Sequence, residues 1–320
     1  MNNTPIQEVF EHKHLGLIFD TSCQWKSHID YILEKASNKL KLLRALKFQI
    51  DRKSLQTMYF SFIRPVIEYS DIVWDNCTQT LKEKLEKINI EAARIVTGAT
   101  KLTSLKLLYK ESGWPTLEKR REEHKLLQYF KMVKSLTPEY LSSLVPEQHH
   151  NIHNYNTRNA QDYVHLRTHS THYYNSFLPS CVRLWNNLPP NIKEMTSIVS
   201  FKKAISSNTP EVPKYYYAGT RLGQILHARL RMNCSSLKQH LYEKNIEPNP
   251  YCQCNQVEST FHFLLSCKLY DAQRKLLERQ IDHPLTLDLL LYGNPNLPYT
   301  ENKNIFISVQ KFIINSKRFT

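Results

Sequence analysis

Glycine is scarce in this sequence: only 6 of its 320 residues are glycine, where about 7% is usual in soluble domains. Folds that need glycine at many turns, such as propellers and long β-sandwiches, and sites built on glycine-rich phosphate loops are therefore not expected. Adjacent aspartates are missing as well. Metal-dependent nucleotidyl transfer needs paired carboxylates to hold two ions, so the sequence offers no catalytic residues for that chemistry.

Long apolar runs are also missing. No stretch approaches the roughly 18 apolar residues of a transmembrane helix, and the segment from Met1 to Pro5 lacks the basic and apolar regions of a signal peptide. The seven cysteines are then expected in a reducing compartment, as unpaired or metal-bound thiols. We expect a protein of the cytoplasm or the nucleus, neither secreted nor held in a membrane.

Positive charge is what the sequence has in excess. It carries 43 Lys and Arg against 29 Asp and Glu, a net charge of +14. An excess of this size indicates a polyanionic partner, most often nucleic acid. Hydrophobic residues at 41% with charged residues at 22% are typical of a chain that folds into globular domains.

Helical periodicity dominates the pattern after Trp25. One apolar stripe runs from Ile29 to Leu46 and a second from Leu81 to Ile95, with Gly98 placed to end the second helix. Further helices are expected at about 104–112, 117–136, 177–188 and 197–207. A short apolar run before residue 20 favours a strand or a hairpin edge. We therefore predict a mainly α-helical fold with a small extended element at its N-terminus.

Local signals mark helix ends and domain borders. Asp51 is placed to cap a helix, and Pro65 should kink or break the same helix. Residues 147–175 hold six of the fourteen histidines, without a convincing ligand spacing, and indicate a solvated surface connection rather than a metal site. Two prolines mark a linker at Asn208–Lys214. We predict a helical domain at 1–145, a connecting region of short helices and linker at 146–214, and a C-terminal helical module at 215–320.

Four ligand-type residues cluster in the C-terminal module: Cys252, Cys254, His262 and Cys267, with the spacing C-x-C-x7-H-x4-C. In an extended segment, Cys252 and Cys254 point the same way and can share one ion. His262 and Cys267 are separated by about 500° on a regular helix, so the chain must turn or the helix must end between them. Three thiolates and an imidazole suit a structural Zn²⁺ without an open position. Buried apolar cysteines beside a surface histidine are the alternative, but such a cluster rarely arises by accident.

Basic side chains gather on several predicted helix faces. Because they bind phosphates and release counterions, they give affinity for nucleic acid without sequence preference. For any single face an ordinary solvated helix surface is the alternative, and the net charge favours binding for at least one face. Tryptophans could stack on bases, although Trp74 and Trp114 stand in contexts typical of a core. The candidate phosphate-binding residues are Lys39, Lys41, Arg44, Lys47, Arg120, Arg121, Arg229 and Arg231.

Several sequence blocks, taken in order over roughly residues 10–275, resemble the C-terminal half of a LINE-type (non-LTR) retrotransposon reverse transcriptase. They are His14–Asp20 with Trp25 and His28-Ile29, Ile63–Tyr69 with Val73-Trp74, Ala92–Gly98, Gly113–Leu117 with Arg120-Arg121, Asn156–Arg158, Ser176–Pro179, Leu184–Pro189, His227–Arg231 and the Cys/His motif.

This resemblance implies a thumb-like bundle in residues 1–145 that grips a template–primer duplex, and a CCHC zinc knuckle that helps to bind template RNA or target DNA. The fingers and the palm with its paired aspartates are missing, as is an upstream endonuclease, and Mg²⁺ is expected only for that palm. The chain looks like a fragment that binds nucleic acid and is inactive alone. A zinc-stabilised helical scaffold for a protein partner is one alternative. A polymerase subunit active only with a palm supplied by another chain is the other. The partner would then be the missing palm or endonuclease portion of the parent element.

Overall fold

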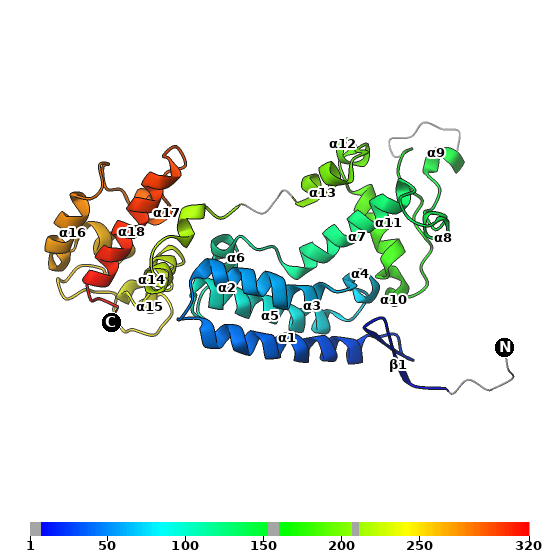
Figure 1. Ribbon diagram of the computed structural model, residues 1–320, viewed down its shortest axis with the longest axis horizontal. Coiled ribbons are helices and arrows are strands. Elements are labelled where there is room, and N and C mark those ends of the chain that lie inside the picture. The colour runs from blue at the N-terminus through cyan, green and yellow to red at the C-terminus, as the bar shows by residue number, and fades with distance from the viewer. Residues whose placement is uncertain (1–7, 153–159, 207–210, 320) are drawn as a thin grey trace. The chain divides into compact units, whose positions relative to one another are not determined.

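The computed structural model describes residues 8–152, 160–206 and 211–319, and these residues are mainly helical with one small sheet (Figure 1). This confirms the predicted fold class. The sheet is an antiparallel hairpin of β1 (Glu11–His14) and β2 (Leu17–Asp20), in which Glu11 lies opposite Asp20. Leu15 and Gly16 form its turn, both with positive φ. Among the described residues, no helix is long and apolar enough to cross a membrane.

Contacts divide the chain into two compact units, each made of three stretches. Unit 1 comprises Met1–Ser37, Arg64–Ile88 and Pro115–Thr209, and unit 2 comprises Asn38–Ile63, Asn89–Trp114 and Pro210–Thr320. Each unit thus draws on more than one of the predicted ranges 1–145, 146–214 and 215–320.

The two apolar stripes predicted in the first 112 residues are largely buried. Ile29, Ala36 and Leu43 of the first helix, for example, are almost fully buried. Leu42, Phe62 and Leu105 of the same helical region are exposed. The helices are α1 (Lys26–Leu46), α2 (Arg52–Met58), α3 (Arg64–Glu68), α4 (Asp71–Trp74), α5 (Gln79–Thr97) and α6 (Leu105–Ser112), with a π-helical turn at Tyr59–Ile63.

Helix ends in this region have local causes. The Asp51 side chain accepts hydrogen bonds from the backbone N–H groups of Lys53 and Ser54, which confirms the predicted cap of α2. Pro65 does not end the helix, because α3 continues through it to Glu68. The helical run is instead locally widened before Pro65, in the π-helical turn that ends at Ile63. Gly98 follows α5 at φ +79°, and an added Cβ would come within 2.6 Å of Ile225 Cγ1, so glycine is required there.

The core of unit 1 forms where three helices pack together, α7 (Leu117–Val133), α11 (Phe177–Asn186) and α13 (Ile198–Ser206). Phe130 stacks on Phe201, and Trp185 stacks on the same ring. Of the predicted histidine-rich connection and linker, residues 153–159 and 208–210 lie outside the described part. The short helices around this core are α8 (Glu139–Ser142), α9 (His149–Ile152), α10 (Thr171–Tyr174) and α12 (Pro190–Lys193).

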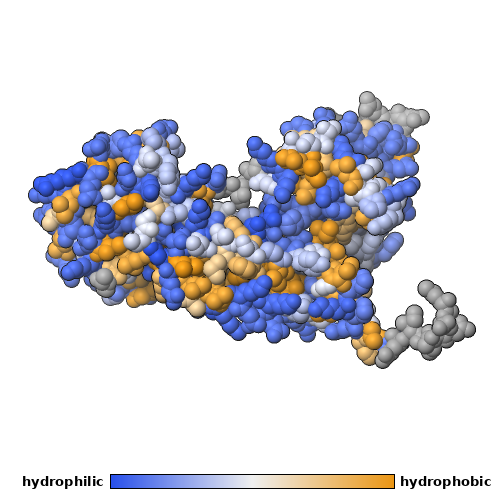
Figure 2. All heavy atoms as spheres, in the orientation of Figure 1, coloured by the Kyte–Doolittle hydropathy of each residue, from blue (hydrophilic) through white to orange (hydrophobic). Residues whose placement is uncertain are grey.

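The C-terminal part of unit 2 packs around the last helix, α18 (Tyr299–Asn315), which contacts α14 (Arg221–Arg231), α16 (Asp271–Glu278) and α17 (Leu287–Tyr292). Their apolar faces form one core. Figure 2 shows mostly hydrophilic residues on the visible face of these helices, with small hydrophobic patches between them. Shorter elements complete the unit: α15 (Lys238–Tyr242), a π-helical turn at His262–Ser266 and 3-10 turns at Lys214–Tyr217 and Lys268–Tyr270.

Candidate metal centre and basic pocket

A tight turn presents the first two cysteines of the motif. Tyr251 pairs with Val257 across the turn, and the N–H of Cys252 donates to the carbonyl of Gln256 at 2.8 Å. Within the turn, Asn255 takes the left-handed conformation at φ +63° that closes the chain on itself. One short loop thus presents both Cys252 and Cys254.

The second pair of ligand-type residues spans the π-helical turn. The N–H of Cys267 donates to the carbonyl of His262 at 2.7 Å, a bond between residues five apart, and Cys267 itself is extended. The wider turn brings two residues that a regular helix would separate to the same side, and the helix then ends. The chain thus turns between His262 and Cys267, which is one of the two predicted ways for these residues to share an ion, and the helix ends at Cys267.

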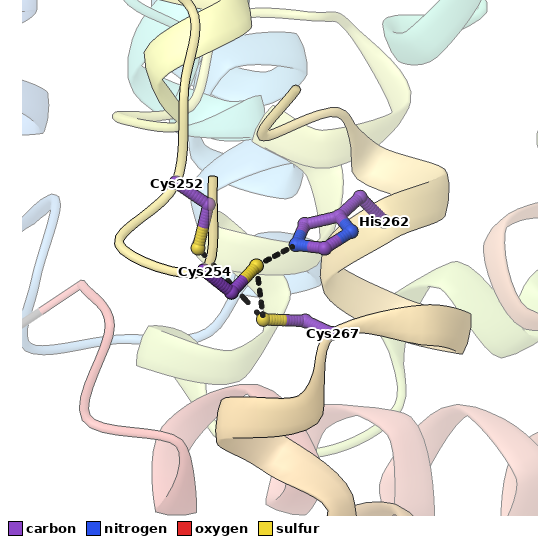
Figure 3. A group of neighbouring side chains, drawn as sticks. All are labelled: Cys252, Cys254, His262 and Cys267. Atoms are coloured by element: carbon purple, nitrogen blue, oxygen red, sulfur yellow. Dashed lines mark hydrogen bonds between the residues drawn. The ribbon is translucent and has the colours of Figure 1, made fainter. Parts of the chain in front are cut away.

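The four side chains converge on one point (Figure 3). Cys267 Sγ lies 3.8 Å from Cys252 Sγ and 3.9 Å from Cys254 Sγ, and Cys254 Sγ lies 3.1 Å from His262 Nε2. All four ligand atoms lie within 4.8 Å of one another. The sulfurs are too far apart for a disulfide, whose length is about 2.05 Å. Their separation is the edge of a tetrahedron around an ion with metal–sulfur bonds of about 2.3 Å. These residues can hold a metal ion.

The surroundings of the cluster favour a structural role over a catalytic one. Cys252, His262 and Cys267 are buried, and only Cys254 is partly exposed. Burial raises the pKa of the Cys267 thiol to about 12, whereas a bound divalent cation stabilises the thiolate and lowers it. The Ser266 hydroxyl lies 3.3 Å from His262 Nδ1, where it can fix the orientation of the ring.

Basic residues that are far apart in the sequence meet at a second feature of unit 2, a pocket of about 240 Å³ that we name the basic pocket. The predicted residues Arg44 and Lys47 line it, and so does Arg229. Sequence reasoning missed the other three cations, although Arg94 belongs to one of the blocks that carry the resemblance. Glu91 is the carboxylate of the lining. The full set of cations is Arg44, Lys47, Arg94, Lys101, Arg221 and Arg229.

Backbone carbonyls hold two of these guanidinium groups. Arg221 donates to the carbonyls of Lys47, Ile95 and Val96 at 2.6–2.8 Å, and Arg229 Nε donates to the carbonyl of Gly98 at 2.8 Å. Carbonyls at a helix C-terminus lack intrahelical partners and carry partial negative charge, so they attract cations. The ends of α1 and α5 therefore fix the two arginines beside the pocket.

The remaining predicted residues of unit 2 lie elsewhere. Lys39 and Lys41 are exposed on α1, where Lys39 donates to the carbonyl of Phe62 and Lys41 to the side chain of Asn38. Arg231 is buried and pairs with Glu111, so it offers no surface to a phosphate. Its partner is 120 residues away in the sequence, which explains why the local pattern did not reveal the pair.

Arg120 and Arg121 belong to unit 1 and are engaged in ion pairs there. Arg120 pairs with Glu68 at 2.9 Å and with Glu123 at 3.1 Å. Arg121 was predicted to bind phosphate, but it is buried and pairs with Asp75 at 2.7 Å. The same aspartate also contacts Lys82 and Lys125. Both arginines thus stabilise the packing of α7 instead of pointing to solvent.

Comparisons with known proteins do not assign a family. No family model, no curated protein and no solved structure matches this chain. The likeness to a retrotransposon reverse transcriptase stays a prediction from the sequence blocks.

Proposed function

We propose that this protein binds RNA or DNA through backbone phosphates, in a helical unit that a structural Zn²⁺ stabilises. It would serve as the nucleic-acid-binding part of a non-LTR retrotransposon reverse transcriptase, without catalytic carboxylates of its own. The basic pocket is the observation that carries the proposal. Six cations and one carboxylate line it, and they come from stretches that are far apart in the sequence. Gathering like charges costs free energy, so a site of this kind suits an anionic ligand.

The proposed identity of the metal rests on the ligand set. Three thiolates with one imidazole are typical of structural zinc, and the sulfur separations of 3.8 and 3.9 Å fit the geometry of such a site. Four protein ligands leave no position open for a substrate or water, which favours a role in stability. The candidate zinc site and the basic pocket both belong to unit 2.

Binding of labelled RNA and DNA oligonucleotides to the full chain, measured by fluorescence anisotropy, tests the proposal. We expect an affinity that differs little between sequences and falls steeply between about 50 and 200 mM salt, because each neutralised phosphate releases counterions. Salt-insensitive binding, or no binding at low salt, would overturn the proposal. The latter result would favour the protein-scaffold alternative, for which the apolar groove around Leu42, Met58 and Phe62 is the candidate surface.

A further inference from the structure

We infer that the basic pocket seats a single backbone phosphate of a single-stranded nucleic acid, while the neighbouring base stacks on Phe48 at its rim. This inference rests on the proposed function and makes it specific.

The charge of the pocket is compensated only in part. Arg44 lies 3.0 Å from Glu91 and Arg94 lies 3.9 Å from it, so one carboxylate serves two guanidinium groups. Among the residues that the structure describes, Lys47, Lys101 and Arg221 have no carboxylate within 4.0 Å. An anion in the pocket would provide the missing counter-charge.

Arg221 is a buried cation that lies near two other arginines and one aspartate, Asp51. Burial, together with the nearby charges of Arg52 and Arg229, lowers the pKa of Arg221 to about 10. Backbone carbonyls nevertheless hold its guanidinium in one orientation, so the charge is fixed in place before a ligand arrives. A phosphate beside it would favour the protonated form and raise this pKa again.

Two donors of the lining also have unused hydrogen-bonding capacity. Arg94 Nε and Thr100 Oγ1 are buried atoms without a hydrogen-bond partner among the described residues. A buried donor without a partner costs roughly 1–3 kcal/mol, so native proteins rarely keep one without a reason. Neither atom is exposed to the pocket, so a phosphate oxygen, which is a strong acceptor, would reach it only after the side chain turns toward the pocket.

Size and lining limit what can enter. The pocket measures about 240 Å³, below the roughly 300–1,000 Å³ typical of sites that enclose a whole small molecule. A phosphate group fits this space, which is too small to enclose a whole nucleotide. At the rim, Phe48 is 65% exposed, and the Lys47 ammonium lies 4.6 Å from the centre of its ring. An exposed aromatic ring beside a phosphate seat is the arrangement by which single strands are held.

The first test compares two double variants of the full, zinc-loaded chain, with equal changes in net charge. K47A/K101A removes two pocket cations, and K53A/K275A removes two exposed lysines of unit 2 that do not line the pocket. For a single-stranded oligonucleotide we expect K47A/K101A to weaken binding about tenfold and to lower the slope of log K against log salt by about 0.7. The control should change the affinity less than about twofold. Equal effects of both variants would overturn the inference while leaving the proposed function intact.

The second test separates a strand from a free phosphate. F48A should weaken single-strand binding by about tenfold, F48W should restore it, and neither should alter duplex binding, because only an unpaired base can stack. Titration with inorganic tripolyphosphate should show binding that K47A/K101A lowers and F48A leaves unchanged. If F48A has no effect on the single strand, or if tripolyphosphate binds while no oligonucleotide does, the inference is overturned. The latter result also refutes the proposed function. Equal zinc content and melting temperature of the variants confirm that they are folded.

Discussion

Unlike the other three residues of the Cys/His cluster, Cys254 is partly exposed, and it contacts two of them. It lies 3.1 Å from His262 Nε2 and 3.9 Å from Cys267 Sγ, and its side chain contributes little to the core. Replacing it with serine therefore tests metal binding with little loss of packing. We expect C254S to lower the zinc content from one ion per chain to near zero, measured by atomic emission, and to lower the melting temperature. The matched control is C23S, which removes an exposed thiol outside the cluster. A C254S protein that keeps its zinc would refute the site.

His240 is a histidine that burial holds neutral. Its Nδ1 lies 2.8 Å from Ser235 Oγ and its Nε2 lies 3.1 Å from Thr260 Oγ1, and burial lowers its pKa to about 4. Below pH 6.5 the unfolded chain therefore binds a proton that the native chain does not, so the free energy of unfolding falls as the pH falls toward 4. Above pH 6.5 this residue makes stability nearly independent of pH.

The variant H240Q cannot titrate at this position and isolates the effect. Between pH 7 and pH 5, the free energy of unfolding of the wild type should fall by about 2 kcal/mol more than that of H240Q, measured by urea denaturation with excess zinc. Acid release of zinc affects both proteins and cancels in the difference. A difference that stays constant with pH would show that His240 does not hold the low pKa.

The environment of a residue could be predicted from the sequence where its contact partners are close to it in the chain. The Cys/His cluster could be predicted because its four members lie within one short segment, whose turn follows from the spacing. The environments of Arg121 and Arg231 could not be predicted, since Asp75 and Glu111 are far away in the sequence. A basic residue looks the same in the sequence whether it faces solvent or a buried carboxylate.

Three helices of unit 2 meet at a buried group of charges. Glu111 of α6 receives hydrogen bonds from Arg52 of α2 at 2.6 Å and from Arg231 of α14 at 2.7 Å. Burial acts to raise the pKa of Glu111, but the two arginines outweigh it and hold the carboxylate ionised. The Arg231 guanidinium also stacks on the ring of Tyr216 at 4.0 Å. These contacts fix the packing of α2, α6 and α14 in one arrangement.

The variant E111Q keeps the shape of this side chain and removes its charge. Two buried guanidinium groups then lack an anion, and we expect a loss of about 3–5 kcal/mol in the free energy of unfolding, measured by urea denaturation. The control E118Q neutralises an exposed glutamate at the start of α7 and should change stability by less than about 0.5 kcal/mol. If E111Q were as stable as the wild type, the charge group would not hold the three helices together.

Element ends could be predicted where one residue decides them. Asp51 caps α2, and Gly98 and Gly113 end α5 and α6 at positive φ. The π-helical turn at His262–Ser266 could not be predicted, because its extra residue per hydrogen-bonded ring has no local sequence signature. The predicted metal cluster required that the chain turn or the regular helix end between His262 and Cys267. The π-helical turn meets this requirement.

Local sequence patterns say least about how the chain divides into compact units. The ranges 1–145, 146–214 and 215–320 were drawn from changes in composition along the chain, whereas each compact unit combines three separate stretches. Long-range contacts decide such units, and periodicity does not encode them. The net charge of +14 predicted an anionic partner without a location. The basic pocket brings Arg44 and Lys47 together with Arg229, and it is the location that we propose for that partner.

Removal of the metal should affect the two units differently. Phe263 and Leu264 lie between the ligands His262 and Cys267, and both are fully buried in the core that packs against α14, α16 and α18. A metal that ties this turn to the loop of Cys252 therefore also holds two core side chains in place. The core of α7, α11 and α13 in unit 1 contains none of the four ligands.

Hydrogen exchange of the full chain, followed by mass spectrometry with and without a chelator, measures this difference. We expect chelation to accelerate exchange of α14, α16 and α18 by at least about tenfold, which corresponds to about 1.4 kcal/mol of lost protection. Exchange of α7, α11 and α13 should stay within about twofold, because their core keeps all its contacts. Acceleration spread evenly over both sets of helices would mean that the metal stabilises the chain as one cooperative body. No acceleration in α14, α16 and α18 would mean that the metal is not structural.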